Sequence, residues 1–386
     1  MKTIIPLFSF FVVLLASAGC ANQDYNTDLL DKEITLFEKE ISVPVGDVGP
    51  FTLELALKSK TIGSLLGSVL QTEEDGTIIG KNSEDFYKIN AYEIVAKTKD
   101  LSQPFTYPVG DKELSPSALA ISLLTSFGFR PVDQHVSIKV NNPLNASYTL
   151  GDSCFVRCMN LKSGETTFQK YVALSGITIS GGYGTTTLLE TDIPETVTEV
   201  PYKMGVKGLS FNLPADLMDK ISSSNAEFTF TSNYTGHIAA GENLNLDLAS
   251  LGLGSISAKA KLPIGPYRLK DVQVSFDLEN TFPLDVTLSS LQLMTGEEPA
   301  VDTNLEVSPG TLVIGGGSPQ KPTVTPITLR IKALSGAIPD ITGIQVGLKL
   351  SSASGYTTTP LSVKQGISVK SASATLRGGI TFGNHE

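Results

Sequence analysis

The side chains that most often carry catalysis are scarce in this chain of 386 residues. It has three histidines: His135 opens a strand-like segment, His237 lies in the polar stretch NYTGHIAAG, and His385 is the next-to-last residue. Carboxylates such as Asp277 and Glu279 fall on the polar side of an alternating segment, where we expect solvation. The motifs HExxH and GxSxG, a phosphate-binding loop and a calcium loop are all missing. The sequence therefore predicts a protein that is not an enzyme and needs no cofactor or metal.

Two cysteines, Cys154 and Cys158, are the next candidates for chemistry. In an extended strand, residues four apart have Cα atoms about 13 Å apart, whereas a disulfide needs Cα atoms within about 7 Å. A disulfide would therefore require a turn or helical hook between them, which an exported compartment would permit. The sequence leaves a disulfide and two free thiols both open, and it disfavours a metal or redox role.

The third cysteine, Cys20, follows a segment that is typical of export. Lys2 supplies a short positive start, residues 4–15 are apolar, and residues 16–19 (ASAG) are small, as at a processing site. The apolar run is shorter than the roughly 20 residues that span a membrane as a helix. Residues 1–19 are therefore predicted to be a signal peptide.

The small residues before Cys20 resemble a bacterial lipobox. The resemblance implies that Cys20 becomes the first mature residue and carries a diacylglyceryl thioether and an N-linked acyl chain such as palmitate. Ser17 departs from the pattern, which usually has leucine there, and an ordinary cleaved signal peptide is the alternative. Two or more acyl chains would give stable membrane anchoring. Residues 20–40, polar and acidic, then form a tether.

The composition favours an exported β protein. The net charge of −10, with only 29 basic residues, argues against nucleic acid or an anionic lipid surface as partner. Glycine and proline are frequent, and charged residues make up only 18% of the chain, which is low for a helical protein. Tryptophan is absent, so any aromatic binding surface must use tyrosine or phenylalanine.

An internal repeat indicates the organisation of the chain. The stretch VSIKVNNPLNASYTL, beginning at Val136, resembles VSFDLENTFPLDVTL, beginning at Val274. Further along, VALSGITISGG (172–182) matches VSPGTLVIGGG (307–317), and residues 225–260 align loosely with 343–379. The order of blocks is the same, which predicts two β modules over the ranges 131–262 and 263–386.

Alternation within the first pair of blocks predicts the fold class. Apolar residues keep one parity on both sides of each proline, and the second copy has two extra residues before Pro283 relative to Pro143. A two-residue insertion leaves the apolar residues on the same face, as a one-sided antiparallel sheet requires. Because proline cannot donate to a ladder, each should lie at an edge, a bulge or a corner between sheets. The sequence thus predicts mainly β structure, as tandem antiparallel sandwiches of the immunoglobulin-like kind.

Residues 41–130 are predicted to form a separate β-rich region that contains a helix. A short signature recurs around Pro44, Pro108 and Pro263, and its first occurrence marks either a divergent third unit or only a similar turn. Three helices are expected, at 116–127, at 61–75, and after Pro214 in the segment 212–223.

The chain as a whole resembles envelope and surface lipoproteins of uncharacterised function from gut Bacteroidota, built of tandem β-sandwich-like modules. The resemblance implies a non-enzymatic binding or scaffolding role at the outer membrane, facing either outward or the periplasm. The ligand is open: a glycan held by Tyr183, Tyr234 and Tyr356 in expected loops, an apolar molecule inside a β module rolled around helix 116–127, or a protein bound by strand addition.

Overall fold

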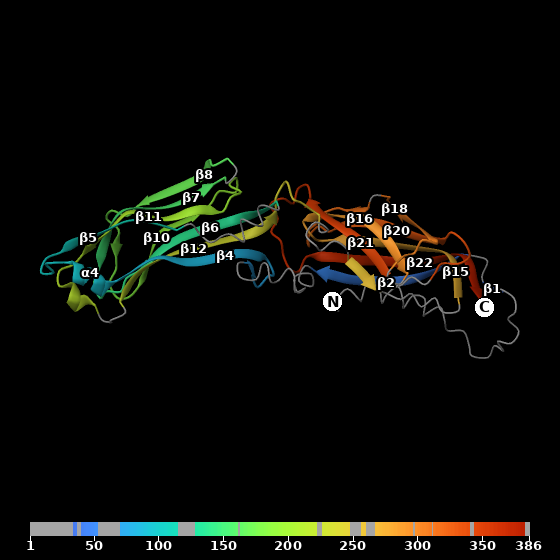
Figure 1. Ribbon diagram of the computed structural model, residues 1–386, viewed down its shortest axis with the longest axis horizontal. Helices are drawn as coiled ribbons and strands as arrows, with labels where there is room; N and C mark the ends of the chain where they lie inside the picture. Colours follow the sequence, from blue (N-terminus) through green and yellow to red (C-terminus); the bar gives the residue numbers. More distant parts are fainter. Residues whose placement is uncertain are drawn as a thin grey trace. The chain divides into compact units, whose positions relative to one another are not determined.

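A computed structural model describes eleven segments of the chain and confirms a mainly β fold built from antiparallel sheets (Figure 1). No helix within these segments is long and apolar enough to cross a membrane. Cys20 and the predicted signal peptide and helix 116–127 lie outside them. The described residues are 34–36, 40–52, 70–114, 128–160, 163–221, 226–247, 256–259, 267–295, 298–310, 312–339 and 343–382.

The chain divides into two compact units, and one interrupts the other. Unit 2 is Ser64–Ala239, whereas unit 1 combines Met1–Gly63 with Ala240–Glu386. Strand β2 (Ile41–Thr52) belongs to unit 1, where it pairs with β22 (Gly366–Phe382) near the other end of the chain. The structure therefore differs from the predicted ranges. Residues 41–130 are no separate region, because their strands are shared between the two units through pairings far apart in sequence.

Unit 2 is a two-sheet sandwich. Its first sheet has the order β10 (Thr185–Asp192), β6 (Phe129–Asn141), β12 (Glu227–Ala240), β4 (Ile78–Asn90) and β3 (Leu70–Thr72). Its second sheet has the order β5 (Phe105–Leu114), β11 (Pro201–Leu213), β7 (Tyr148–Met159) and β8 (Thr166–Ala173), and β9 (Thr178–Ile179) also pairs with β7. Phe211 and Phe228, one from each sheet, pack with ring centroids 4.7 Å apart and close the core between them.

Helices are few in the described part of unit 2, as expected, but their positions differ from those predicted. Helix α4 (Ala91–Lys97), which was not predicted, begins where the Asn90 side chain accepts a hydrogen bond from Tyr92 N. The segment after Pro214 forms only a four-residue 3-10 turn, Leu217–Lys220. Most of the predicted helix 61–75 lies outside the described residues, and within its described part Leu70–Thr72 are strand β3.

Unit 1 repeats this strand order. Its first sheet has the order β1 (Ile34–Leu36), β22, β15 (Tyr267–Asn280), β20 (Thr323–Ala333) and β18 (Thr303–Ser308), and β2 also pairs with β22. Its second sheet has the order β13 (Asn245–Asp247), β21 (Gly343–Ser352), β16 (Leu284–Thr295) and β17 (Glu298–Pro299). In that sheet β14 (Ile256–Lys259) also pairs with β21, and β19 (Leu312–Ile314) also pairs with β16.

The two sandwiches therefore share one plan, with β6, β7, β11 and β12 of unit 2 equivalent to β15, β16, β21 and β22 of unit 1. Strand β2 takes the place of β4 beside β22 and completes unit 1. The recurring proline signature marks no third unit, since Pro44 lies in β2 and Pro108 in the non-equivalent β5. The loose match of 225–260 with 343–379 was wrong, because it set β12 against β21.

In unit 2 a buried asparagine builds the corner between β6 and β7. Asn142 is 1% exposed, and its side-chain amide donates to Ala146 O at 2.9 Å and Ser180 O at 2.7 Å. Its carbonyl oxygen accepts from Leu144 N at 2.9 Å. The buried amide is thus fully used in joining the corner to the turn after β9.

In unit 1 Asn280 does the same between β15 and β16. It is fully buried, and its amide donates to Leu284 O at 3.1 Å and Gly315 O at 2.9 Å. Its carbonyl oxygen accepts from Phe282 N at 2.8 Å. The predicted match of 172–182 with 307–317 sets Ser180 opposite Gly315, so the structure confirms that match.

The corners also correct one reading of the sequence. Four residues separate Asn142 from Ala146, and four separate Asn280 from Leu284, so the two corners have equal length. Pro143 and Pro283 occupy different places within a corner of constant length, and the predicted two-residue insertion was wrong. Both prolines lie where the chain passes from one sheet to the other, which is one of the three places left open by the sequence.

Candidate functional site

The two cysteines of unit 2 are part of the core. Cys154 and Cys158 lie in β7, both fully buried and both free thiols. Burial raises the pKa of each thiol to about 12, which keeps it protonated and unreactive at neutral pH. The alternative of a disulfide was wrong, because β7 is extended across both positions and holds the Cα atoms too far apart.

The histidines in the described segments form surface ion pairs. His237 lies in β12 rather than in the expected loop, with Nδ1 3.0 Å from Asp133 and Nε2 3.2 Å from Glu73. Burial lowers the pKa of His237, but the hydrogen bonds to these two carboxylates outweigh it, and the net pKa is raised. His135 lies 2.9 Å from Asp192. Each ring is held by carboxylates, and no third reactive group converges on it among the described residues.

The three tyrosines proposed for ligand binding do not form one site. Tyr234 lies in β12, is 2% exposed, and donates its hydroxyl to Gln134 Oε1 at 3.1 Å, so it is a core residue. Tyr356 lies in a turn of unit 1 and is partly exposed. Tyr183 lies in a turn of unit 2 with φ +64 and is 53% exposed. Only Tyr183 and Tyr356 are therefore accessible, and they belong to different units.

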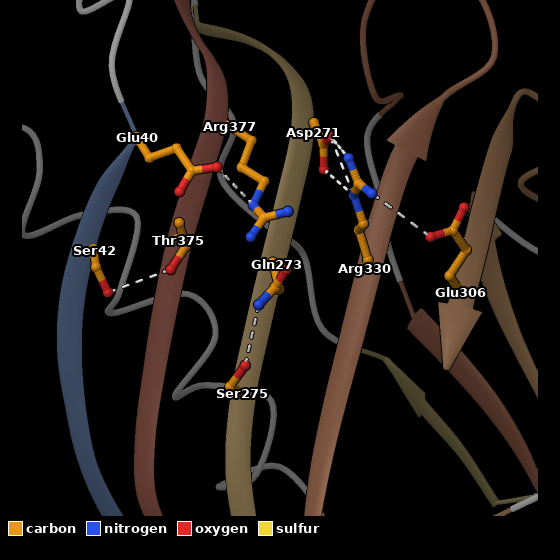
Figure 2. Close-up of polar contacts among 9 residues, drawn as sticks. All are labelled: Glu40, Ser42, Asp271, Gln273, Ser275, Glu306, Arg330, Thr375 and Arg377. Carbon is orange, nitrogen blue, oxygen red and sulfur yellow. Dashed lines mark hydrogen bonds and ion pairs between the residues drawn. The ribbon is translucent and has the colours of Figure 1, made fainter. Parts of the chain in front are cut away.

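A row of alternating charges crosses the first sheet of unit 1 (Figure 2). Arg330 on β20 donates to Asp271 on β15 at 2.9 Å and lies 3.8 Å from Glu306 on β18. Arg377 on β22 pairs with Glu40, next to β2, at 3.1 Å. The hydrogen bond from Arg330 holds the pKa of Asp271 below its ordinary value. Because each arginine is paired with at least one carboxylate, we interpret the row as a set of links between neighbouring strands, including the link from Glu40 to β22, and not as a site for a charged ligand.

A shallow depression of about 390 Å³ lies in unit 2, where β5 and β7 begin, β11 ends and β9 passes. Its apolar part comes from Pro104, Phe105, Tyr148, Leu213 and Pro214. Its polar part consists of hydroxyl and amide side chains, and no charged residue is among those that line it; the polar residues are Thr106, Ser147, Thr149, Thr178 and Asn212. We call it the distal depression.

Strand register sets four of the five polar residues of the distal depression, all but Ser147, in one row. Asn212 pairs with Thr106 on one side and Thr149 on the other, and Thr149 pairs with Thr178. The Thr106 hydroxyl donates to Asn212 Oδ1 at 2.8 Å, and Asn212 Nδ2 donates to Thr149 Oγ1 at 3.1 Å. The row is therefore held in one arrangement before any ligand arrives.

The distal depression lies at the end of unit 2 that is opposite its chain connections. The chain leaves unit 2 after β12. The last residue pair between β12 and β4 is His237 with Ile79, so the end of β12 lies beside the start of β4. Leu213 of the depression follows Phe211, which packs on Phe228 at the start of β12. A strand of 14 residues spans about 46 Å at roughly 3.3 Å per residue. Helix α4 and β5 mark this far end (Figure 1).

The turn that carries Tyr183 is tied to the distal depression by one hydrogen bond. Gly181 N donates to the Ser147 hydroxyl at 3.2 Å, which ties the turn 180–184 to a lining residue. A Cβ at Gly181 would come within 2.8 Å of Ala146 backbone atoms, so only glycine permits this approach. Tyr183 follows two residues later and projects into solvent.

Unit 1 has different chemistry at the equivalent positions. There Lys349 pairs with Asp247 on one side and Thr287 on the other, and Thr287 pairs with Val313. Thr149 and Thr287 both lie seven residues after the corner asparagine, which confirms the equivalence. The neutral row of unit 2 is thus replaced in unit 1 by an acid, a base, a hydroxyl and an apolar side chain.

Comparison with known proteins assigns neither a family nor a function to the chain. No family model and no curated protein matches the chain. Among solved structures, it is similar to a Parabacteroides distasonis protein described as secreted, with 14% identity over 88% of this chain and 100% of that one, at a TM-score of 0.43. It also matches the VP2 subviral particle of infectious bursal disease virus, with 12% identity over 97% of this chain and 80% of that one, at a TM-score of 0.20. The first match is to a protein from the Bacteroidota.

Proposed function

We propose that this protein is a non-enzymatic binding protein of the cell envelope, anchored in the outer membrane by lipid on Cys20. The predicted tether 20–40 is shorter than expected, because Ile34–Leu36 form β1 of unit 1, and unit 2 is inserted into unit 1. The strands of unit 2 nearest to the two unit boundaries, β3 and the last residues of β12, both pair with the start of β4, at one end of unit 2. The observation that carries the proposal is that the distal depression lies at the opposite end of unit 2. A binding surface in that position is remote from the points of attachment.

The state of the reactive side chains supports a non-enzymatic role. The two described cysteines are buried with raised pKa values, and the two described histidines are ion-paired at the surface. A general base or nucleophile would need an accessible group with its pKa near the working pH. The described residues use these groups for packing and pairing instead.

The first test concerns the anchor. The full chain and Cys20→Ala are produced in a bacterium that processes lipoproteins, and the N-terminal peptide is weighed by mass spectrometry. We expect acylation of Cys20 and retention in the outer-membrane fraction, both lost in Cys20→Ala. An unmodified Cys20, or identical fractionation of the two proteins, would refute the anchor.

The second test concerns binding. The full chain is heated with polysaccharides, with phospholipid vesicles and with peptides, and the unfolding of each unit is followed by calorimetry. A ligand that binds only the native state raises the unfolding temperature. We expect one class to raise the transition of unit 2. No shift with any class would contradict a binding role, and a shift with vesicles alone would favour the apolar-ligand alternative.

A further inference from the structure

We infer that the distal depression binds a neutral carbohydrate, with Tyr183 beside the sugar ring and the row of hydroxyl and amide groups on its hydroxyls. This inference rests on the proposed binding function and names the class of ligand. Three features support it: the hydrogen-bonding capacity of the depression, its lack of charge, and the exposed Tyr183 on the turn 180–184, which Gly181 ties to the lining residue Ser147.

The polar row keeps unused hydrogen-bonding capacity after its internal bonds are made. The Thr106 hydroxyl donates its hydrogen to Asn212, so its oxygen can still accept a hydrogen bond from a ligand. Thr149 accepts from Asn212, so its own hydrogen remains to be donated. The row therefore offers an acceptor and a donor at fixed spacing on neighbouring strands. Vicinal sugar hydroxyls, each both donor and acceptor, match such an array.

The residues that line the depression argue against charged and apolar ligands. A phosphate or carboxylate ligand would need a cationic side chain, and no lysine or arginine lines the depression. A cationic ligand would need a carboxylate, which is also missing from the lining. An acyl chain would cover the acceptor of Thr106 and the donor of Thr149 that their bonds to Asn212 leave unused, at a cost in affinity. A neutral ligand rich in hydroxyl groups satisfies the lining in each respect.

The size of the depression and the exposed tyrosine of the adjoining turn also suit a sugar. The volume of about 390 Å³ lies in the range of small-ligand sites, roughly 300–1,000 Å³, and the depression is open to solvent. Tyr183 is more than half exposed although tyrosines bury well, and it has positive φ, which non-glycine residues seldom adopt. An exposed aromatic ring offers an apolar face to the C–H side of a sugar and a hydroxyl to its edge.

The test uses the full chain and affinity electrophoresis in gels that contain one polysaccharide each: xylan, mannan, laminarin, dextran or starch, with polygalacturonate as the acidic probe. We expect at least one neutral polymer to retard the protein and polygalacturonate to leave it unretarded. Asn212→Lys places in the row the side chain that unit 1 has at the equivalent position. We expect it to weaken retention about tenfold, as the loss of one or two hydrogen bonds would.

Tyr183→Ala is the second variant and should weaken retention about fivefold to tenfold, since an aromatic contact of ~1 kcal/mol corresponds to that factor. Because Tyr183 is exposed, this variant should fold normally, and circular dichroism checks that both variants do. Lys349→Asn, the reverse change in unit 1, is the matched control and should bind as the unmodified protein does.

Four outcomes would overturn the inference. The first two are that no neutral polymer retards the protein, and that polygalacturonate retards it more strongly than any neutral polymer. The third is that neither Asn212→Lys nor Tyr183→Ala changes the retention. The fourth is that Asn212→Lys weakens the binding of a peptide and leaves the binding of polysaccharide unchanged. The last leaves the proposed binding function standing and changes only the ligand class. Failure of the proposed function would instead appear as an unacylated Cys20 and no ligand of any class.

Discussion

The two units have the same interior corner and different outer surfaces. Asn142 and Asn280 are both buried, and each makes three hydrogen bonds to equivalent backbone atoms. On the outer face, Asn212 of unit 2 is replaced by Lys349 in unit 1. A buried amide with all its partners in the backbone cannot change without cost, whereas an exposed side chain can change freely. Function in this protein is therefore to be sought where the units differ.

The units differ also in how their chains are closed. Unit 2 is one continuous segment, whereas unit 1 needs β2 from before the insertion to cover the edge of β22. Ion pairs and hydrogen bonds, such as Glu40 with Arg377 and Ser42 with Thr375, hold β2 to β22 (Figure 2). The same plan is thus self-contained in one unit and dependent on a distant strand in the other.

Cutting the chain at the unit boundaries should have the largest effect on stability. It tests directly whether unit 2 is self-contained and unit 1 depends on β2. We expect residues 64–239 to fold alone with a cooperative urea transition, and residues 240–386 alone to show none, because β22 then lacks β2. Circular dichroism and urea titration are the measurements. As a control, a peptide of residues 34–52 should restore a transition to 240–386. A cooperative transition of 240–386 without the peptide would contradict the role of β2.

Replacing either corner asparagine should have the next largest effect. Asn142→Ala should destabilise unit 2 by ~2–4 kcal/mol, and Asn280→Ala should destabilise unit 1 by a similar amount, since each leaves buried backbone groups unpaired. Calorimetry that resolves two transitions is the measurement. Asn145→Ala, at an exposed neighbouring position, is the control and should change stability by less than ~0.5 kcal/mol. Equal effects on both transitions would argue against independent corners.

Two buried tyrosines of unit 2 allow a hydroxyl that has a hydrogen-bond partner to be compared with one that has none among the described residues. Tyr234→Phe should cost ~1 kcal/mol, because it removes the hydroxyl bonded to buried Gln134. The Tyr148 hydroxyl is buried and has no hydrogen-bond partner within the described segments. Tyr148→Phe should therefore be neutral or stabilising. Chemical denaturation measures both, and a larger loss for Tyr148→Phe than for Tyr234→Phe would contradict the assigned contacts.

The smallest expected effect is a pH dependence that belongs to unit 2 alone. The pKa of His237 is raised in the folded state, so its ion pairs with Asp133 and Glu73 stabilise fully below the ordinary histidine pKa of about 6.5. This stabilisation is lost as the pH rises through the folded pKa. Since the pairs are partly exposed, we expect less than ~1 kcal/mol.

The measurement is the unfolding temperature of the unmodified protein and of His237→Gln at pH 5.5 and pH 8.5. The two proteins should differ more at pH 5.5 than at pH 8.5, and only in the transition of unit 2. The transition of unit 1 is the internal control. An equal difference at both pH values would show that His237 acts by packing rather than by charge.

Local patterns of the sequence predicted much of this fold correctly. Alternation around Val136 and Val274 predicted strands, and the prolines limited their own positions to an edge, a bulge or a corner between sheets, because both features depend on residues close together in the chain. The alternation did not reveal that Tyr234 and His237 belong to a strand, since NYTGHIAAG is polar enough to resemble a loop. Its intermediate polar residues lie between buried ones, a pattern of period two that could have been found.

The sequence by itself determined the β class and the doubled plan, since each rests on local side-chain periodicity or on similarity between two stretches of one chain. Only the tertiary structure showed that Asn142 and Asn280 hold the corners, because their partners Ser180 and Gly315 lie more than 30 residues away. Only the tertiary structure decided that unit 2 interrupts unit 1, because the partner of β2 lies more than 300 residues away. Only the tertiary structure assembled the distal depression. Thr106, Thr149 and Asn212 come from separate strands, and strand register, which depends on packing of the whole sandwich, sets them side by side.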